Sequence, residues 1–231
     1  MTIRVLLISP AMGPALRAAR FGEEPPEGPD PEAPGNSPGP DTAEDSSGTD
    51  SAVDSRAVDA AGVRRTEAVR EDFLRTARTA ALYVSPSPRC RTTAGLLGLD
   101  ARPLPDLAPW AMGRWRGRTL DEVAAAEPRE VGAWLTDPAA APHGGESLLT
   151  LNARVGRWLD TLSPDEPRVV AVAEPDIVRA AAVHALGAPA GAFWRFDVRP
   201  LTATEFTGRD GRWNLLGGRP LAGEEAAGQE I

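Results

Sequence analysis

The sequence predicts an α/β fold: a mainly parallel sheet with helices on both faces and an antiparallel edge. Short apolar runs typical of buried strands alternate along the chain with longer segments of helical character. The last two runs are joined by a hairpin turn, which supplies the antiparallel edge. At 231 residues, the chain is long enough for one domain with a full core and rather short for two.

Five runs of strand character are present. The first, at 4–8, begins almost at the first residue and ends at Ser9-Pro10. The others are 81–84, 168–173, 201–207 and 212–216. The last two flank Asp210-Gly211, a dipeptide favoured in tight hairpin turns.

Helices are predicted between these runs, at 57–80, 89–97, 119–126, 130–135, 147–162 and 175–186. Thr119 followed three residues later by Glu122 is a capping-box signature, which indicates where one helix begins. Gly98 and Gly187 follow two other helices and are stop signals.

Residues 22–55 differ in composition, because they carry ten carboxylates, no base and almost no large apolar side chain. Such a segment cannot bury enough apolar surface to offset its ordering entropy. We therefore expect a single domain over 1–221, interrupted by a disordered acidic insertion at 22–56, and a flexible tail at 222–231. A solvated insertion is the simpler interpretation, and a partner-binding role for this loop stays open.

The bulk properties exclude several classes of protein. A net charge of −8 argues against a nucleic-acid binder. Cys90 is the single cysteine, so no intrachain disulfide can form and a secreted scaffold is not expected. No apolar stretch approaches the ~20 residues that span a membrane, and the N-terminus lacks a signal-peptide pattern. We expect a cytoplasmic protein without membrane or nucleic-acid partners.

Four motifs occur in order along the chain. Asp59-Ala-Ala-Gly62 opens the first long helix, and Ser85-Pro-Ser-Pro-Arg89 is followed by Thr93-Ala94. Met112-Gly-Arg-Trp-Arg-Gly117 precedes Thr119-Leu-Asp-Glu-Val123, and Pro142-His-Gly-Gly-Glu-Ser147 comes last. Together they resemble the histidine phosphatase superfamily, the phosphoglycerate-mutase-like proteins. The resemblance implies a three-layer α/β/α sandwich with its active site at the carboxyl ends of the strands.

Family members transfer a phosphoryl group to a histidine at the end of the first strand, assisted by a second histidine and a glutamic acid. The resemblance places Pro10 at the position of the nucleophile, after Ser9 in place of a pocket arginine. Glu174 stands for the second histidine, and Pro109 for the proton donor. Proline has no side-chain nucleophile. A carboxylate near a bound phosphate costs about 4 kcal/mol per phosphate charge at ~4 Å in an effective dielectric of ~20.

Arg89 and Arg20 are what the resemblance leaves of the phosphate cradle. We expect the Glu174 carboxylate to pair with one of them, because an arginine–carboxylate fork is favourable there. A solvent-exposed carboxylate of no consequence is the alternative.

Other candidate residues lack partners in the sequence. His143 lies on a loop that approaches the pocket in the family, so it is a candidate ligand-binding residue, with a structural position as the default. His184 is expected to be a satisfied helix residue. Ser9 and Cys90 have no nearby base that would activate them. Two histidines so far apart make no metal signature, so we expect neither metal nor cofactor.

The sequence thus predicts a catalytically degenerate member of the family, a pseudophosphatase acting as a small-molecule-binding or regulatory module. Arg89, Arg20, Glu174 and His143 would hold its ligand, a small anionic metabolite or a protein. One alternative is a phosphomonoesterase that uses non-standard residues on a sugar phosphate, a phosphoglycerate-like compound or alpha-ribazole phosphate. The other is a protein-interaction module acting through the acidic loop.

Overall fold

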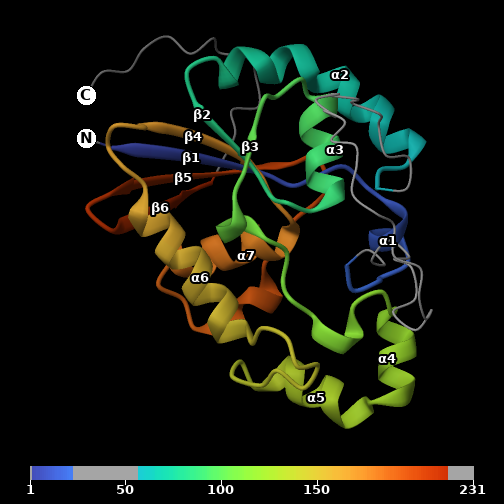
Figure 1. Ribbon diagram of the computed structural model, residues 1–231. Coiled ribbons are helices and arrows are strands. Elements are labelled where there is room, and N and C mark those ends of the chain that lie inside the picture. The colour runs from blue at the N-terminus through green and yellow to red at the C-terminus, as the bar shows by residue number, and fades with distance from the viewer. Residues whose placement is uncertain (1, 23–56, 218–231) are drawn as a thin grey trace, which may run out of the picture.

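A computed structural model describes residues 2–22 and 57–217 of the chain (Figure 1). The acidic insertion expected at 22–56, apart from Gly22, and the tail expected at 222–231 lie outside these residues. The described part contains a six-stranded sheet in the order β3-β2-β4-β1-β5-β6. The strands are β1 (Ile3–Ile8), β2 (Ala81–Val84), β3 (Arg102–Pro103), β4 (Arg168–Val172), β5 (Ala203–Arg209) and β6 (Arg212–Leu216).

The sheet is parallel from β3 to β1 and antiparallel at β5 and β6, which confirms the predicted fold class. Asp210 and Gly211 both adopt positive φ angles in the turn between β5 and β6, as a tight hairpin of this type requires. The sequence did not predict β3, because a strand of only two residues leaves no periodicity to detect.

Helices cover both faces of the sheet, α2 and α3 on one and α6 and α7 on the other (Figure 1). The α-helices are α1 (Pro14–Arg17), α2 (Ala60–Ala77), α3 (Pro88–Leu96), α4 (Leu120–Ala126), α5 (Pro128–Thr136), α6 (Leu148–Thr161) and α7 (Pro175–Ala185). Short 3-10 helices span Pro105–Leu107, Gly113–Trp115 and Ala190–Arg195. Among the described residues, none of these helices combines the length and the apolar character needed to cross a bilayer.

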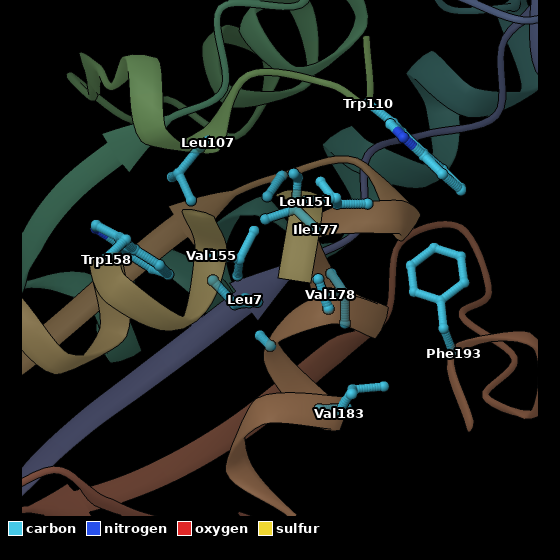
Figure 2. Packing of buried hydrophobic residues seen from close by; sticks show 14 of the residues in the cluster. Leu7, Leu107, Trp110, Leu151, Val155, Trp158, Ile177, Val178, Val183 and Phe193 are labelled. Carbon is cyan, nitrogen blue, oxygen red and sulfur yellow. The ribbon is translucent and has the colours of Figure 1, made fainter. Parts of the chain in front are cut away.

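The central strands are buried on both faces, and alternate side chains serve two cores. Leu7 of β1 points toward α6 and α7 (Figure 2), and Val5 belongs to the same, larger apolar cluster. Ile8 of β1 and Val172 of β4 belong to a second cluster, formed with α2 and α3. Because side chains on both faces of these strands are packed, apart from the exposed Arg4 and Arg168, the strands contain the continuous apolar runs that made them recognisable.

Capping side chains set where four of the seven described α-helices begin, namely α2, α3, α4 and α6. The Thr119 hydroxyl and the Glu122 carboxylate form the predicted capping box at α4. Asp59 accepts a hydrogen bond from the Gly62 N–H, so α2 begins at Ala60 and not at residue 57 as predicted. At its other end, α2 stops three residues short of the prediction, where the Ala80 N–H turns back to the Ala77 carbonyl.

Two glycine motifs lie against each other between the sheet and α4–α5. A methyl group at Gly145 would overlap the carbonyl oxygen of Ala111, and one at Gly113 would overlap that of His143. The backbones at 111–113 and 143–145 therefore approach more closely than side chains would allow. Gly144 differs, because it has a positive φ but no heavy atom near the place of a Cβ.

We expect Gly145→Ala to lower the free energy of unfolding by about 3 kcal/mol, because the new methyl group collides with backbone that cannot rotate away. Gly144→Ala is the matched control and should cost only about 1 kcal/mol, from its left-handed backbone. Urea unfolding of the two variants measures the difference. Equal losses of unfolding free energy in the two variants would show that the close approach of the two backbones does not exclude a side chain at position 145.

Candidate functional site

Most of the buried polar side chains lie at the carboxyl ends of the parallel strands. Ser9 follows β1, and Ser85 and Ser87 follow β2. Arg89 and Thr93 come from the first turns of α3. We call these five residues and Glu174, which follows β4, the strand-end cluster. They meet because neighbouring parallel strands end at the same edge of the sheet.

The start of α3 fixes the position of Arg89. Ser87 caps the helix by accepting a hydrogen bond from the Cys90 N–H at 3.1 Å, and Pro88 sets the first helical φ. The Ala11 N–H donates to the Thr93 hydroxyl at 3.1 Å, so the segment after β1 is tied to the same helix. A Cβ at Gly13 would lie 3.3 Å from the Cδ of Arg89, which places this segment alongside the arginine.

Glu174 and Arg89 form a buried ion pair. Arg89 donates from Nη2 to one carboxylate oxygen and from Nε, at 3.4 Å, to the other. The Ser87 hydroxyl donates to that second oxygen at 2.7 Å. The two side chains are only 9% and 12% exposed. The pairing expected from the sequence is therefore present, and Arg89, not Arg20, is the partner.

The electrostatics of the pair follow from its burial. Burial opposes the charge on Arg89, but attraction by Glu174 outweighs it and raises the pKa of the guanidinium. Burial, together with the nearby Glu174 carboxylate, raises the pKa of the Cys90 thiol well above its usual value. Cys90 is fully buried in α3, so it is a packed thiol and not an activated nucleophile.

Two donors of the cluster have no partner among the described residues. They are Nη1 of Arg89 and the hydroxyl of Ser9, which are both buried. Buried polar groups normally have hydrogen-bond partners, and an unsatisfied group costs about 1–3 kcal/mol. The cluster thus holds hydrogen-bonding capacity that the Glu174 carboxylate does not use.

Asp176 is a second carboxylate at this edge that sequence reasoning missed. Its side chain accepts a hydrogen bond from the Trp110 N–H at 2.6 Å and another from the Ile177 N–H at 2.9 Å. Burial, followed by repulsion from Glu174, raises the pKa of Asp176 to about 6. The site therefore contains a carboxylic acid that titrates near neutrality, next to the loop of Pro109.

That loop is held in place from the other side by α6. Arg154 pairs with the Glu146 carboxylate at 2.8 Å and donates to the carbonyls of Asp106 and Ala108. The indole N–H of Trp110 donates to the Glu146 carbonyl at 2.6 Å. Together with Asp176, these bonds fix residues 106–110 between α6 and α7.

The structure places two predicted ligand-binding residues outside the strand-end cluster. Arg20 donates from Nη1 to the Gly117 carbonyl and forms a backbone bridge with Thr119. His143 is 1% exposed and packs against Trp115 with tilted rings, whose centroids are 5.1 Å apart. Burial, with help from Arg114, lowers the pKa of His143. A structural position, the default expected for His143, agrees with this packing, and ligand binding by either residue stays a prediction.

His184 is hydrogen-bonded as expected, with Nε2 3.1 Å from the Asp160 carboxylate. In the part of the chain that the structure describes, no group of three or more His, Cys, Asp or Glu side chains is arranged to hold a metal ion. The two prolines that the resemblance places at catalytic positions differ in exposure: Pro10, which follows Ser9, is buried, and Pro109, which precedes Trp110, is half-buried.

Comparison with known families identifies the fold. The family model described as the histidine phosphatase superfamily (branch 1) matches residues 49–218, most of the chain. The chain belongs to the histidine phosphatase superfamily. One curated relative is "Bifunctional protein Rv2228c" of Mycobacterium tuberculosis. It is 30% identical to this chain over 153 residues, which are 63% of this chain and 42% of the relative. The chain therefore spans about two fifths of that relative's length.

Solved structures of histidine phosphatase type share the fold across nearly the whole chain. A putative alpha-ribazole-5'-P phosphatase from Escherichia coli superposes with a TM-score of 0.72 at 19% identity, covering 96% of this chain and 99% of that one. Mycobacterial glucosyl-3-phosphoglycerate phosphatase gives 0.67 at 22% identity, covering 92% and 96%. At these identities the similarity establishes the fold alone, which confirms the three-layer histidine-phosphatase-like architecture.

We expect Arg89→Ala to lower the free energy of unfolding by about 3 kcal/mol, because it leaves the Glu174 charge buried without its cation. Arg168→Ala, at an exposed arginine, is the control and should change stability by less than about 0.5 kcal/mol. The double variant Arg89→Met/Glu174→Leu should recover most of the loss, since no charge remains buried. Chemical denaturation measures all three; equal effects of the two alanine variants would contradict the buried pair.

Asp176→Asn should stabilise the protein in a pH-dependent way. The pKa of Asp176 is raised, so its ionised form opposes folding above about pH 6, and the cost disappears as pH falls toward 4. The difference in unfolding free energy between variant and wild type should therefore change by about 2 kcal/mol in the variant's favour between pH 4 and pH 8. Unfolding curves across this range test it, with the exposed Asp100→Asn as control. A difference that does not vary with pH would be the contrary result.

Proposed function

We propose that this chain is a non-catalytic member of the histidine phosphatase superfamily, which keeps the fold as a small-molecule-binding or regulatory module. The family's chemistry needs an imidazole that attacks phosphorus and a second one that steadies the phosphoryl group. The motif resemblance places Pro10 and Glu174 at these positions, and Pro109 at that of the acid. None of the three replacements can perform the role of the residue it replaces.

The observation that carries this proposal is the buried bond between Glu174 and Arg89. An arginine that would hold a phosphate in a working enzyme is here neutralised by a carboxylate of the same chain. Ser87 donates to the same carboxylate, so a second donor of the site is also in use. A phosphate dianion approaching Arg89 would meet the negative charges of Glu174 and Asp176.

The proposed module comprises residues 1–221, with the acidic segment 22–56 as an insertion. Its ligand would be a small anionic metabolite or a protein. Two structural neighbours are named as phosphatases of small phosphorylated metabolites. That similarity supports a metabolite of this class as the first ligand to try.

A second candidate function is a phosphomonoesterase with an altered set of residues. One observation favours it, since Asp176 has a pKa of about 6 and lies next to the loop of Pro109. A carboxylic acid that titrates near neutrality suits proton donation to a leaving group. The chain still offers no histidine as nucleophile there, which is why we rank this candidate second.

A screen of the purified protein against phosphate monoesters separates the two candidates. We expect no turnover above background with sugar phosphates, phosphoglycerate-like compounds or alpha-ribazole phosphate, because the cluster has no histidine to act as nucleophile or to activate one of its hydroxyls. Release of inorganic phosphate and formation of a phosphoenzyme are the measurements. Restoring the histidines, in Pro10→His with Glu174→His, should increase phosphoenzyme formation. Phosphate release should rise less, because Pro109 does not supply a proton donor.

Turnover that is lost in Arg89→Ala but retained in Arg209→Ala would overturn the non-catalytic proposal. Arg209 is a suitable control because it lies, largely exposed, in the distant hairpin. Circular dichroism of Arg89→Ala must first show that the variant is folded.

The interaction role of the acidic loop stays a prediction. Deletion of residues 23–56 tests it, since a ligand of the strand-end cluster should bind equally well without them.

A further inference from the structure

The strand-end cluster retains the donors of an anion site. Nη1 of Arg89 and the Ser9 hydroxyl have no partner in the described ranges, and both side chains are more than nine-tenths buried. The Ser87 hydroxyl and the remaining N–H groups of Arg89 already hold one anion, the Glu174 carboxylate. Buried guanidinium and hydroxyl donors at the end of a parallel sheet are suited to an oxyanion.

Glu174 is bound as a ligand would be bound. It is the N-cap residue of α7, yet its side chain makes no capping hydrogen bond to that helix. Its carboxylate instead reaches across to α3, where Arg89, Ser87 and the Cys90 thiol surround it. Because the Glu174 carboxylate binds a buried arginine instead of capping its own helix, it takes the place of a bound anion. We call it the resident anion of the cluster.

Asp176 adds a second negative charge two residues further along α7. The charged groups around it are Glu174 on the same helix, Arg89 on α3 and Arg154 on α6. Arg154 is already paired with Glu146, and Arg89 with Glu174. With both α7 carboxylates ionised, their two negative charges outnumber the single positive charge of Arg89.

We propose that the strand-end cluster is an oxyanion-binding site held shut by two carboxylates of α7, with Glu174 as the resident anion and Asp176 as a proton-sensitive repelling charge. This inference rests on the proposed non-catalytic function, because a working phosphatase would keep the arginine open for its substrate. An incoming anion must displace Glu174 from Arg89 and tolerate Asp176. Neutralising either carboxylate therefore favours its binding.

The effect of pH has a definite sign. Below about pH 6 Asp176 becomes protonated, so the charge that repels an anion falls and affinity rises. Linkage requires the reverse as well: a bound anion favours protonation of Asp176 and promotes proton uptake. A dianion such as inorganic sulfate is the suitable probe, because its own charge stays constant over the range tested.

The experiment measures sulfate binding by calorimetry at pH 7.5 and pH 5.5. The proteins are the wild type, Glu174→Gln, Asp176→Asn and a control, Glu166→Gln. Glu166 lies just before β4, at the amino-terminal end of that strand and so away from the strand-end cluster, and it accepts a hydrogen bond from Tyr83. We expect Glu174→Gln to bind sulfate about 100-fold more tightly than the wild type at pH 7.5, within the ~1,000-fold that one adjacent charge can impose. Wild-type affinity should rise about tenfold at pH 5.5, and Asp176→Asn should remove this rise.

A further variant locates the binding. Glu174→Gln combined with Arg89→Met carries no buried charge at the pair, and it should lose the sulfate affinity that Glu174→Gln gained. Equal affinity of the wild type and Glu174→Gln, or tight wild-type binding at pH 7.5, would overturn the inference. So would a pH effect that persists in Asp176→Asn. None of these readouts depends on turnover, so they fail separately from the proposed function, which is decided by phosphate release.

Discussion

A buried arginine requires an anion, and at the carboxyl edge of this sheet the anion is the side chain of Glu174. The pair connects α3 to the junction of β4 and α7, two segments that the fold brings together only at this edge. The cost of removing both charges from water is offset by two hydrogen bonds from Arg89 to the Glu174 carboxylate and by a third from the Ser87 hydroxyl. We infer that this pairing limits which other anions can bind at the cluster.

The loop over the cluster is rigid for related reasons. Arg154 on α6 holds two carbonyls of residues 106–108, and Asp176 on α7 holds the next amide of the loop at Trp110. Trp110 also packs edge-on against Phe193, with ring centroids 5.4 Å apart and ring planes at 77°. The segment at which the resemblance places the family's proton donor is fixed by backbone hydrogen bonds and aromatic packing.

Much of the architecture was predictable because its signals are local. The capping box of Thr119 and Glu122, and the hairpin turn at Asp210, each depend on residues a few positions apart. The bond between Glu174 and Arg89 was predictable only because ordered motifs identified the fold. Asp176 was missed, since nothing in the sequence indicates that the loop at Trp110 folds onto the start of α7. Arg20 was expected near the cluster, but its local pairing with the strand-like segment at Thr119 directs its guanidinium elsewhere.

The two partners of the central bond are 85 residues apart in the chain. Closing so long a loop costs entropy before the contact returns any stabilisation, so we expect this pair to form late, after β1, β2 and β4 have aligned. Contacts that form late in folding act mainly on the rate of unfolding and little on the rate of folding. We therefore expect the carboxylate that is proposed to exclude other anions also to slow unfolding of the protein.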